Sequence, residues 1–304
     1  MAETEGGSRE RRENMKAVIP AAGLGMRFLP LTKEQPKEML PVVDRPAIHW
    51  VIEEAVASGV DDILIITGRE KRAVEDYFDS SDRLNHYLRE APDTDGLAQL
   101  EELRQKADFH FIRQREPKGL GDAILRAEKH VGSEPFLVIL GDTINVAEIP
   151  VARQLLDAQE RLGSSVVGIE KVREEKISSY GIVAGEFIEK RVMRIEQMVE
   201  KPEPSEAPSH WGISGTYVLT PAIFDRIRRT PSGKNGEIQL TDALRSQIEE
   251  APVFGYAFEG KRYDIGTKLD WMKAHMELSL MRGDFRGPLL DSMKGWIEDA
   301  KDTH

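Results

Sequence analysis

The sequence predicts an α/β fold with a doubly wound, mainly parallel sheet, a smaller β lobe and C-terminal helices. Two observations lead to this prediction. Through the first half of the 304 residues, apolar runs of strand length alternate with amphipathic helical segments, which is typical of repeated strand–helix–strand units. Several of those runs are apolar at every position, as expected for strands that a parallel sheet buries on both faces.

The first half of the chain contains the most regular elements. Residues 16–19, apolar after Lys16, are too short for a helix and are followed by Pro20, so we expect a buried strand there. Residues 47–58 carry apolar side chains at helical spacing, and Gly59 follows as a stop signal. The same criteria predict strands at 62–67, 109–112 and 136–140, helices at 70–78 and 121–131, and a charged surface excursion at 80–106.

The second half of the chain is less regular. Residues 181–187 and 191–199 are expected to form a strand pair, and residues 235–249 a loop that leads into a helix. Further strands are predicted at 165–171, 212–219 and 253–258, and further helices at 151–161, 221–228, 268–282 and 288–300. We therefore divide the chain into a disordered segment at 1–14, one domain at 15–283 whose β lobe spans about 165–265, and a C-terminal helix at 284–304 as a candidate contact between subunits.

Composition restricts the classes of function. The hydrophobic content of 40% can build a sizeable core, and the lack of cysteine excludes disulfides and thiolate metal sites. The formal net charge of -11 disfavours generic binding to nucleic acid or to anionic membranes. The polar start of the chain and the lack of long apolar runs argue against a signal peptide or a membrane span, so we expect a cytoplasmic protein.

The loop after the first expected strand has the chemistry of a phosphate site. Gly23 and Gly25 let backbone amides approach a ligand without an intervening side chain. Arg27 can pair with phosphate oxygens through its planar guanidinium, and Lys37 can act as a mobile point charge. The loop is not a dinucleotide fingerprint, because Phe28 stands where the third glycine would be, and no Gly-Lys-Ser/Thr follows as in a Walker-type loop.

Two further loops directly follow expected strands, at 114–121 and at 141–142. Ligands of doubly wound sheets bind beyond the carboxyl ends of the strands, so these loops should meet the glycine loop at one edge. Asp142, which comes right after a buried strand, could bind Mg²⁺ there with little side-chain freedom to lose. Taken alone, Asp142 would be a turn residue and Lys37 a surface lysine, and only the combination indicates a site.

With these residues the chain resembles the sugar-1-phosphate nucleotidylyltransferases, and among them most closely the bacterial and archaeal UTP–glucose-1-phosphate uridylyltransferases. The likeness runs from about residue 16 to about residue 279. Each motif is weak evidence alone, but their common order along the chain makes them strong evidence together. The motifs lie at 23–27 with 36–41, 113–114 with 119–121, 142, 180–181, 199–202, 236–242 and 263–266. The resemblance implies a Rossmann-like nucleotidyltransferase core whose β lobe binds the sugar.

The resemblance also implies roles for individual residues. Those that would contact the nucleotide are Ala22, Gly23, Gly25, Gln114 and Gly119. The glycine loop would hold the β- and γ-phosphates of UTP, the Gln114 amide would read the uracil edge, and Gly119 would leave room for the base or the ribose. Those that would line the sugar pocket are Gly181, Glu200 and Gly215.

The implied reaction is attack by a phosphate oxygen of glucose 1-phosphate on the α-phosphorus of UTP, with pyrophosphate as the leaving group. The implied catalytic residues are Arg27, Lys37, Asp142 and Lys201, of which Lys201 would contact the phosphate of the sugar. Asp142 and Asp264 would bind Mg²⁺ between the two phosphates. This reaction needs no general base, and four of the seven histidines lie in amphipathic or surface contexts, so we interpret these four as structural, namely His49, His86, His110 and His130.

The chain departs from the family pattern at a few positions. Met26 replaces the usual threonine of the glycine loop, which removes a hydroxyl contact to phosphate. His210 and Thr216 stand where uridylyltransferases commonly have Asn and Arg, so another sugar 1-phosphate stays open, as does dTTP in place of UTP. A catalytically silent nucleotide sensor is a third alternative, which would be expected to lack one of the cations or carboxylates named above. Relatives commonly form dimers or tetramers, so a homo-oligomer is expected.

Overall fold

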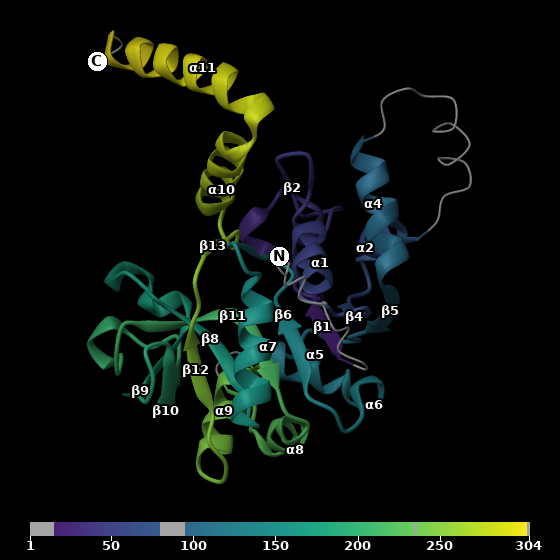
Figure 1. The fold of residues 1–304 in the computed structure, drawn as a ribbon, viewed down its shortest axis with the longest axis vertical. Helices are drawn as coiled ribbons and strands as arrows, with labels where there is room; N and C mark the ends of the chain where they lie inside the picture. The colour runs from purple at the N-terminus through teal and green to yellow at the C-terminus, as the bar shows by residue number, and fades with distance from the viewer. Residues whose placement is uncertain (1–14, 80–94, 234–235, 303–304) are drawn as a thin grey trace, which may run out of the picture.

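The computed structural model describes residues 15–79, 95–233 and 236–302, and Figure 1 shows its fold. The expected disorder at 1–14, the first part of the surface excursion and His86 lie outside the described residues. The strands of the main sheet are β1 (Lys16–Pro20), β4 (Asp62–Thr67), β5 (Asp108–Arg113), β6 (Phe136–Ile139), β8 (Val166–Lys171), β9 (Gly181–Phe187), β10 (Val192–Glu200), β11 (Trp211–Leu219) and β12 (Phe254–Ala257).

Within the described residues these nine strands form one sheet in the order β5-β4-β1-β6-β11-β8-β12-β10-β9. The pairings show that β10 and β11 run against the common direction of the other strands. The α/β class and the mainly parallel sheet are therefore confirmed. The expected strand pair of the β lobe is the antiparallel pair of β9 and β10.

Successive side chains of the central strands enter different hydrophobic clusters on the two faces of the sheet. In β1, Ala17 and Ile19 join one cluster and Val18 joins the other, and in β4 Ile63 and Leu64 divide in the same way. All of these side chains are fully buried. Because neighbouring residues of a strand point to opposite faces, a run that is apolar at every position needs a covering layer on both faces.

Helices supply both layers (Figure 1). The first face is covered by α1 (Ala47–Ala57), α2 (Arg72–Phe78), α4 (Asp95–Lys106) and α7 (Val151–Leu162). The second face is covered by α5 (Leu120–Leu125), α6 (Glu128–Val131), α8 (Ala222–Arg229) and α9 (Leu240–Ile248). The chain ends in α10 (Lys268–Met281) and α11 (Gly283–Asp302), which project away from the sheet. Among the described residues, no helix has both the length and the apolar character needed to cross a membrane.

Two helices differ from the sequence prediction. The sequence predicts one helix at 121–131, whereas the structure divides it into α5 and α6. At the break, the Arg126 and Ala127 N–H groups bond three residues back, to the carbonyls of Ala123 and Ile124, which tightens the turn. The terminal helix α11 begins before the predicted residue 288 and contains Pro288, whose missing N–H leaves one carbonyl without its helical partner.

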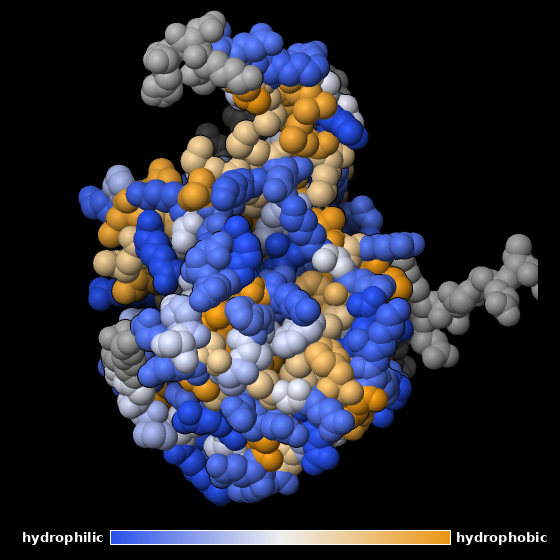
Figure 2. Space-filling model, turned by 90° about the vertical axis from the view of Figure 1, so that its left-hand side faces the viewer, coloured by the Kyte–Doolittle hydropathy of each residue, from blue (hydrophilic) through white to orange (hydrophobic). Residues whose placement is uncertain are grey.

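The projecting helices α10 and α11 carry exposed apolar side chains. Figure 2 shows apolar surface on this part of the molecule. The residues concerned are Leu269, Met272, Met276, Met281, Phe285, Leu290, Trp296 and Ile297. Exposed apolar surface of this extent is typical of protein–protein contacts. The contact between subunits that the sequence suggests for this region stays a prediction.

Two short ladders complete the fold. One pairs β2 (Pro41–Val42) with β3 (Arg45–Pro46). The other pairs β7 (Thr143–Val146) with β13 (Lys261–Asp264) and was not predicted, because both strands are short and partly polar. In this ladder Thr143 lies opposite Asp264, and the next N–H, from Ile265, donates to the Asp142 carbonyl at 3.2 Å. The ladder therefore brings Asp142 and Asp264 together from distant parts of the sequence.

A buried carboxyl group links α1, β7 and α7. The Glu54 side chain accepts hydrogen bonds from Asn145 Nδ2 at 2.8 Å and from the Ala152 N–H at 3.0 Å, at the start of α7. Burial raises the pKa of Glu54 from its ordinary value of 4.5 to about 7, although these hydrogen bonds act in the opposite direction. The ionised form of Glu54 is therefore disfavoured in the folded protein.

We expect Glu54 to make the stability of the protein fall as the pH rises. A carboxyl group whose folded pKa lies above its unfolded value stabilises the fold fully below pH 4.5 and loses this contribution as the pH passes about 7. The loss is roughly 3 kcal/mol, at about 1.4 kcal/mol per pKa unit. Urea unfolding between about pH 5 and pH 8 should show a smaller decline for Glu54→Gln than for wild type. Glu53→Gln, the exposed neighbour, should keep the wild-type decline, and equal slopes for all three proteins would contradict this expectation.

Candidate active site

A cavity of about 610 Å³ opens beyond the carboxyl ends of β1 and β6 and extends to β9, β10 and β13. The three loops that the sequence predicts to converge, at 23–27, 114–121 and 141–142, all contribute to its lining. Every site residue suggested by the sequence also lines it, namely Ala22, Gly23, Gly25, Arg27, Lys37, Gln114, Gly119, Asp142, Gly181, Glu200, Lys201, Gly215 and Asp264. The structure therefore brings these residues to one place, and the roles assigned to them stay predictions.

The glycine loop leaves space for a lysine side chain. Gly25 has φ of 64°, in the left-handed region, and the 3₁₀ turn Met26–Phe28 follows it. A Cβ atom at Gly25 would lie 3.1 Å from Thr32 and 3.3 Å from Lys37, which is tighter than ordinary contact. A Cβ atom at Gly23 would lie 3.7 Å from Lys37 Cε. The absence of a side chain at Gly25 thus lets Lys37 pass close to the loop backbone.

Lys37 forms an ion pair with Asp142, with 2.5 Å between Nζ and Oδ2. Burial alone would lower the pKa of Lys37, but the charges of Asp142, Glu38 and Asp264 outweigh it and raise the pKa above its ordinary value. Burial would raise the pKa of Asp142, but the Lys37 charge and hydrogen bond outweigh it and lower the pKa. Both groups are therefore charged at neutral pH, at the cavity where phosphates are expected.

Next to Lys37 lies a buried ion pair that sequence reasoning missed. Lys71 Nζ donates to Glu38 Oε2 at 2.8 Å, and the two side chains are only 8% and 1% exposed. Burial raises the pKa of Glu38, although the charges of Lys37 and Lys71 act to lower it. Among the described residues Glu38 Oε1 has no hydrogen-bond partner. The pair joins the 36–41 segment to the start of α2. In the sequence, this pair was indicated only by the position of Glu38 between Pro36 and Pro41.

At the other wall of the cavity, Asp264 belongs to a network of polar groups. Its Oδ2 accepts a hydrogen bond from the Tyr180 hydroxyl at 2.6 Å, and its Oδ1 accepts one from the Gly266 N–H at 2.8 Å. Arg262 lies 4.7 Å from the centre of the Tyr180 ring and donates to Glu170 at 2.6 Å. This network holds Asp264 in place. The sequence suggested Asp264 but missed Arg262, whose only signal is its position two residues earlier on the same strand.

Asp264 lies a few residues before α10 but is not the N-terminal cap of this helix. The cap is Thr267, whose side-chain oxygen accepts a hydrogen bond from the Asp270 N–H at 3.1 Å. The Asp264 carboxylate is consequently not used at the helix terminus. Asp264 is the last residue of β13 and lines the cavity instead.

Glu200 is the last residue of β10, and Lys201 follows it directly. Glu200 Oε2 accepts a hydrogen bond from the Thr241 hydroxyl at 2.7 Å, and Lys201 Nζ lies 3.0 Å from Glu200 Oε1. Lys201 has φ of 44°, which is rare for a residue with a side chain, and its N–H donates to the Tyr180 carbonyl at 3.1 Å. A Cβ atom at Gly181 would lie 3.2 Å from Glu200 Oε2, so the strand start passes close to this carboxylate. Thr241 is a further cavity residue that the sequence did not suggest.

Gln114 and Gly119 form the third part of the lining. Gln114 Nε2 donates to Asp122 Oδ2 at 2.7 Å and to the Gly119 carbonyl at 3.2 Å, so the amide oxygen is the group left for a ligand. Gly119 has φ of 94°, and a Cβ atom there would lie 2.7 Å from the Ile238 carbonyl oxygen. The fold therefore requires glycine at position 119 to avoid a clash with the Ile238 carbonyl, whether or not a nucleotide base also contacts it.

The departures from the family pattern occupy different places. Met26 is 65% exposed and lines the cavity. Thr216 is fully buried and lies 3.3 Å from Asn145 Nδ2, while the His210 carbonyl accepts a hydrogen bond from the Val172 N–H. Neither His210 nor Thr216 belongs to the described lining of the cavity. The departures at His210 and Thr216 therefore change residues around the cavity rather than residues that line it.

Asp142 and Asp264 suit a hard divalent cation. The β7–β13 ladder sets them side by side, and both line the cavity. Their carboxylate oxygens are the donor type that Mg²⁺ prefers, and no histidine or cysteine stands with them among the described lining residues. The Lys37 ammonium already pairs with Asp142, so a cation would share this carboxylate with it. The two residues therefore fit a divalent metal.

Comparison with known proteins agrees with this arrangement. The family model described as nucleotidyl transferase matches residues 16–280. The chain is 50% identical over 290 residues to UTP–glucose-1-phosphate uridylyltransferase YngB of Bacillus subtilis (strain 168), covering 95% of this chain and 96% of the relative. The chain belongs to this nucleotidyl transferase family, among the UTP–glucose-1-phosphate uridylyltransferases. The resemblance inferred from the motifs is therefore confirmed.

Solved structures of the family have the same fold. A crystal structure of UDP-glucose pyrophosphorylase complexed with UDP-glucose matches with a TM-score of 0.82 at 42% identity, over 88% of this chain and 99% of that chain. A UTP-bound structure from Acinetobacter baumannii matches with a TM-score of 0.83 at 33% identity, over 93% and 99%. The Rossmann-like core expected from the resemblance is thus confirmed. Enzymes of this family generally use a divalent metal.

Proposed function

We propose that this chain transfers the uridylyl group of UTP to glucose 1-phosphate, giving UDP-glucose and pyrophosphate. The observation that supports this most is the composition of the cavity. Arg27, Lys37 and Lys201 line it together with the carboxylates of Asp142 and Asp264. Two phosphate-bearing anions need such a set of charges to come together. The names of the family members described above favour UTP and glucose 1-phosphate as this pair.

The reaction depends more on the alignment of the two substrates than on proton transfer. A phosphate oxygen of glucose 1-phosphate forms a bond to the α-phosphorus of UTP while the bond from that phosphorus to the β-phosphate oxygen breaks, and pyrophosphate leaves. The attacking phosphate is already ionised at neutral pH, so it needs no general base. Arg27, which is exposed beside the glycine loop, and Lys37 would neutralise the departing pyrophosphate.

On the sugar side, the Glu200 carboxylate would accept hydrogen bonds from the sugar hydroxyls. Its hydrogen bond with Thr241 and its ion pair with Lys201 orient it for this role. Lys201 would bind the phosphate of glucose 1-phosphate. This phosphate would then replace Glu200 as the main partner of Lys201. Gly181 and Gly215 would line the pocket without side chains that obstruct the ring.

On the nucleotide side, the backbone of Ala22, Gly23 and Gly25 would hold the phosphates. The Gln114 oxygen would accept a hydrogen bond from the uracil N3–H, and Gly119 would lie near the base. Asp142 and Asp264 would hold Mg²⁺, which when bound supplies positive charge to the phosphate oxygens. The positions of these residues around one cavity support the assignment.

The same site bears on the three alternatives, which are dTTP, another sugar 1-phosphate and a silent nucleotide sensor. The Gln114 contact would not separate UTP from dTTP, because both bases carry the same N3–H, and a single methyl group decides only about 1 to 3 kcal/mol. His210 and Thr216 lie outside the cavity lining and so do not argue against glucose. A silent nucleotide sensor would not need the complete set of cations and carboxylates. The homo-oligomeric state and the cytoplasmic location stay predictions.

A substrate matrix tests the proposal. Purified protein with Mg²⁺ is offered UTP or dTTP together with the 1-phosphates of glucose, galactose or N-acetylglucosamine, and pyrophosphate release is followed. We expect UTP with glucose 1-phosphate to give the highest kcat/KM, at least about tenfold above dTTP. Better turnover with dTTP, or with another sugar, would replace the proposed substrates. No turnover with any pair would favour the nucleotide sensor.

A further inference from the structure

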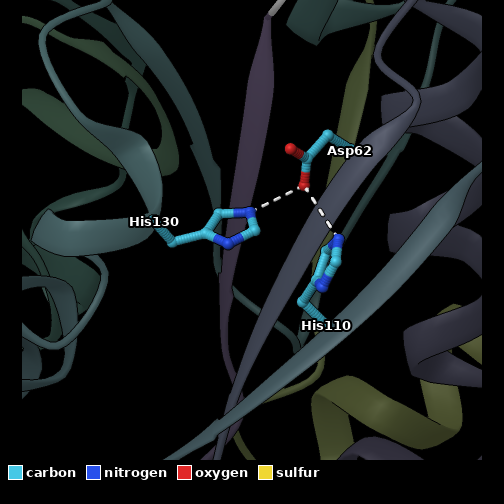
Figure 3. Close-up of side chains that lie close together, drawn as sticks. All are labelled: Asp62, His110 and His130. Carbon is cyan, nitrogen blue, oxygen red and sulfur yellow. Dashed lines mark hydrogen bonds and ion pairs between the residues drawn. The ribbon is translucent and has the colours of Figure 1, made fainter.

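Two histidines and an aspartate lie together outside the active site (Figure 3). Asp62 is the first residue of β4, His110 belongs to β5, and His130 belongs to α6. The Asp62 Oδ1 atom lies 2.7 Å from His130 Nε2 and 3.7 Å from His110 Nε2. The two imidazole rings are 4.7 Å apart between centroids and are tilted by 54°. One carboxylate oxygen thus faces the Nε2 atoms of both rings.

Strand periodicity explains why these side chains share one face. Asp62 lies two residues before Leu64, and His110 lies two residues before Ile112, and both apolar residues pack on the second face of the sheet. Because side chains two apart in a strand point to the same side, Asp62 and His110 also lie on that face. The helix α6 covers the same face and supplies His130. The cluster lies toward the amino ends of β4 and β5, whereas the cavity lies beyond the carboxyl ends of the strands.

The surroundings hold the cluster in place and leave it accessible. Lys16 Nζ donates to the His130 carbonyl at 2.6 Å, which fixes the last turn of α6. The side chains of Asp62, His110 and His130 are 29%, 49% and 18% exposed. An ion can therefore reach all three from solvent while the His130 ring stays largely shielded.

The donor atoms and their spacing suit a transition-metal ion. Zn²⁺ binds imidazole nitrogen and carboxylate oxygen at about 2.0 to 2.2 Å, so neighbouring ligand atoms in a tetrahedral site lie roughly 3.3 Å apart. The distances of 2.7 Å and 3.7 Å lie on either side of this value, and all three ligand atoms are within 4.8 Å of one another. Metal binding would require side-chain rotations that bring the three atoms to that spacing. Two imidazoles with one carboxylate favour Zn²⁺, Co²⁺ or Ni²⁺ over Mg²⁺.

We propose that Asp62, His110 and His130 bind a divalent transition-metal ion of the zinc type, with water in the remaining position. The ion replaces the hydrogen bond between Asp62 and His130 and joins α6 to β4 and to the edge strand β5. This site is separate from Asp142 and Asp264, because none of its residues lines the cavity.

A zinc titration of the full-length protein, without an affinity tag and with excess Mg²⁺ to fill the carboxylate site, tests the proposal. Long-range ¹H–¹⁵N spectra report the ring nitrogens of individual histidines. We expect the Nε2 resonances of His110 and His130 to shift together and to saturate with the same Zn²⁺ dependence. The ring resonances of His49, which lies in α1, should not move with them.

Variants assign the binding to this cluster. His110→Asn and His130→Asn should each weaken Zn²⁺ affinity at least about tenfold in calorimetry, as loss of a ligand requires. The matched control His210→Asn should keep the wild-type affinity. Uridylyl transfer without Zn²⁺ should be unchanged in both cluster variants, because neither residue lines the cavity. Two outcomes would show that the cluster is only hydrogen-bonded and would overturn the proposal. They are unshifted His110 and His130 resonances, or full Zn²⁺ affinity in a double variant that combines His110→Asn with His130→Asn.

Discussion

Asp142→Asn is expected to lower turnover at least about 10³-fold, which corresponds to about 4 kcal/mol of transition-state stabilisation. Asp142 follows β6 directly, forms the ion pair with Lys37 and lies beside Asp264 through the β7–β13 ladder. Asparagine keeps the size of the side chain but removes the negative charge. It therefore weakens metal binding and also leaves the Lys37 ammonium without its main partner.

The measurement is kcat for UTP and glucose 1-phosphate over a range of Mg²⁺ concentrations. Circular dichroism should show the wild-type fold, because Asp142 lies at the cavity and the hydrophobic clusters are untouched. Asp76→Asn, an exposed aspartate of α2, is the matched control and should keep full activity. If Asp142→Asn turned over at more than a tenth of the wild-type rate, the proposed metal site would be in the wrong place.

Lys71→Met is expected to destabilise the protein by about 3 to 5 kcal/mol, the range for breaking one side of a buried ion pair. Glu38 would keep its carboxyl group in a site where that group is only 1% exposed and where Oε1 already has no hydrogen-bond partner among the described residues. Methionine fills a similar volume, so the loss comes from leaving the Glu38 carboxyl group without the Lys71 hydrogen bond and charge rather than from a cavity. Since Glu38 follows Lys37, the glycine loop region should also loosen.

Urea unfolding gives the free energy of unfolding for this series. The double variant Lys71→Met with Glu38→Gln should recover much of the loss, because it removes the unpaired charge together with its partner. Arg72→Met, at the exposed neighbouring position that pairs with Asp76, should cost less than about 1 kcal/mol. A double variant as unstable as Lys71→Met alone would mean that the ion pair is not the cause of the loss.

Much of the core was predictable because its information is local. The runs at 17–19, 63–66 and 136–139, which lie within β1, β4 and β6, are apolar at every position, and burial on both faces is what such runs require. The helix α1 followed from apolar spacing and from the glycine after it. The break between α5 and α6 was missed because helical periodicity continues through it, while the backbone bonding changes at Arg126.

The candidate site was predictable for a similar reason. Gly23, Gly25, Arg27 and Lys37 lie in one stretch, and Asp142 follows a strand whose end has a known place in the fold. The groups that support these residues were not predictable. Lys71 and Arg262 look like ordinary surface cations in the sequence, and only folding gives them buried or partly buried partners in Glu38 and Glu170.

The sequence by itself determined most strands of the main sheet, the loops that follow them and which residues of those loops are candidates for binding phosphate, because length, apolar pattern and glycine placement are properties of neighbouring residues. Only the tertiary structure decided that Asp264 lies beside Asp142, that Arg262 contacts Tyr180, and that Asp62 meets two histidines. These contacts join segments far apart in the chain. Their existence depends on how the whole sheet and its helices pack, which no single stretch of sequence contains.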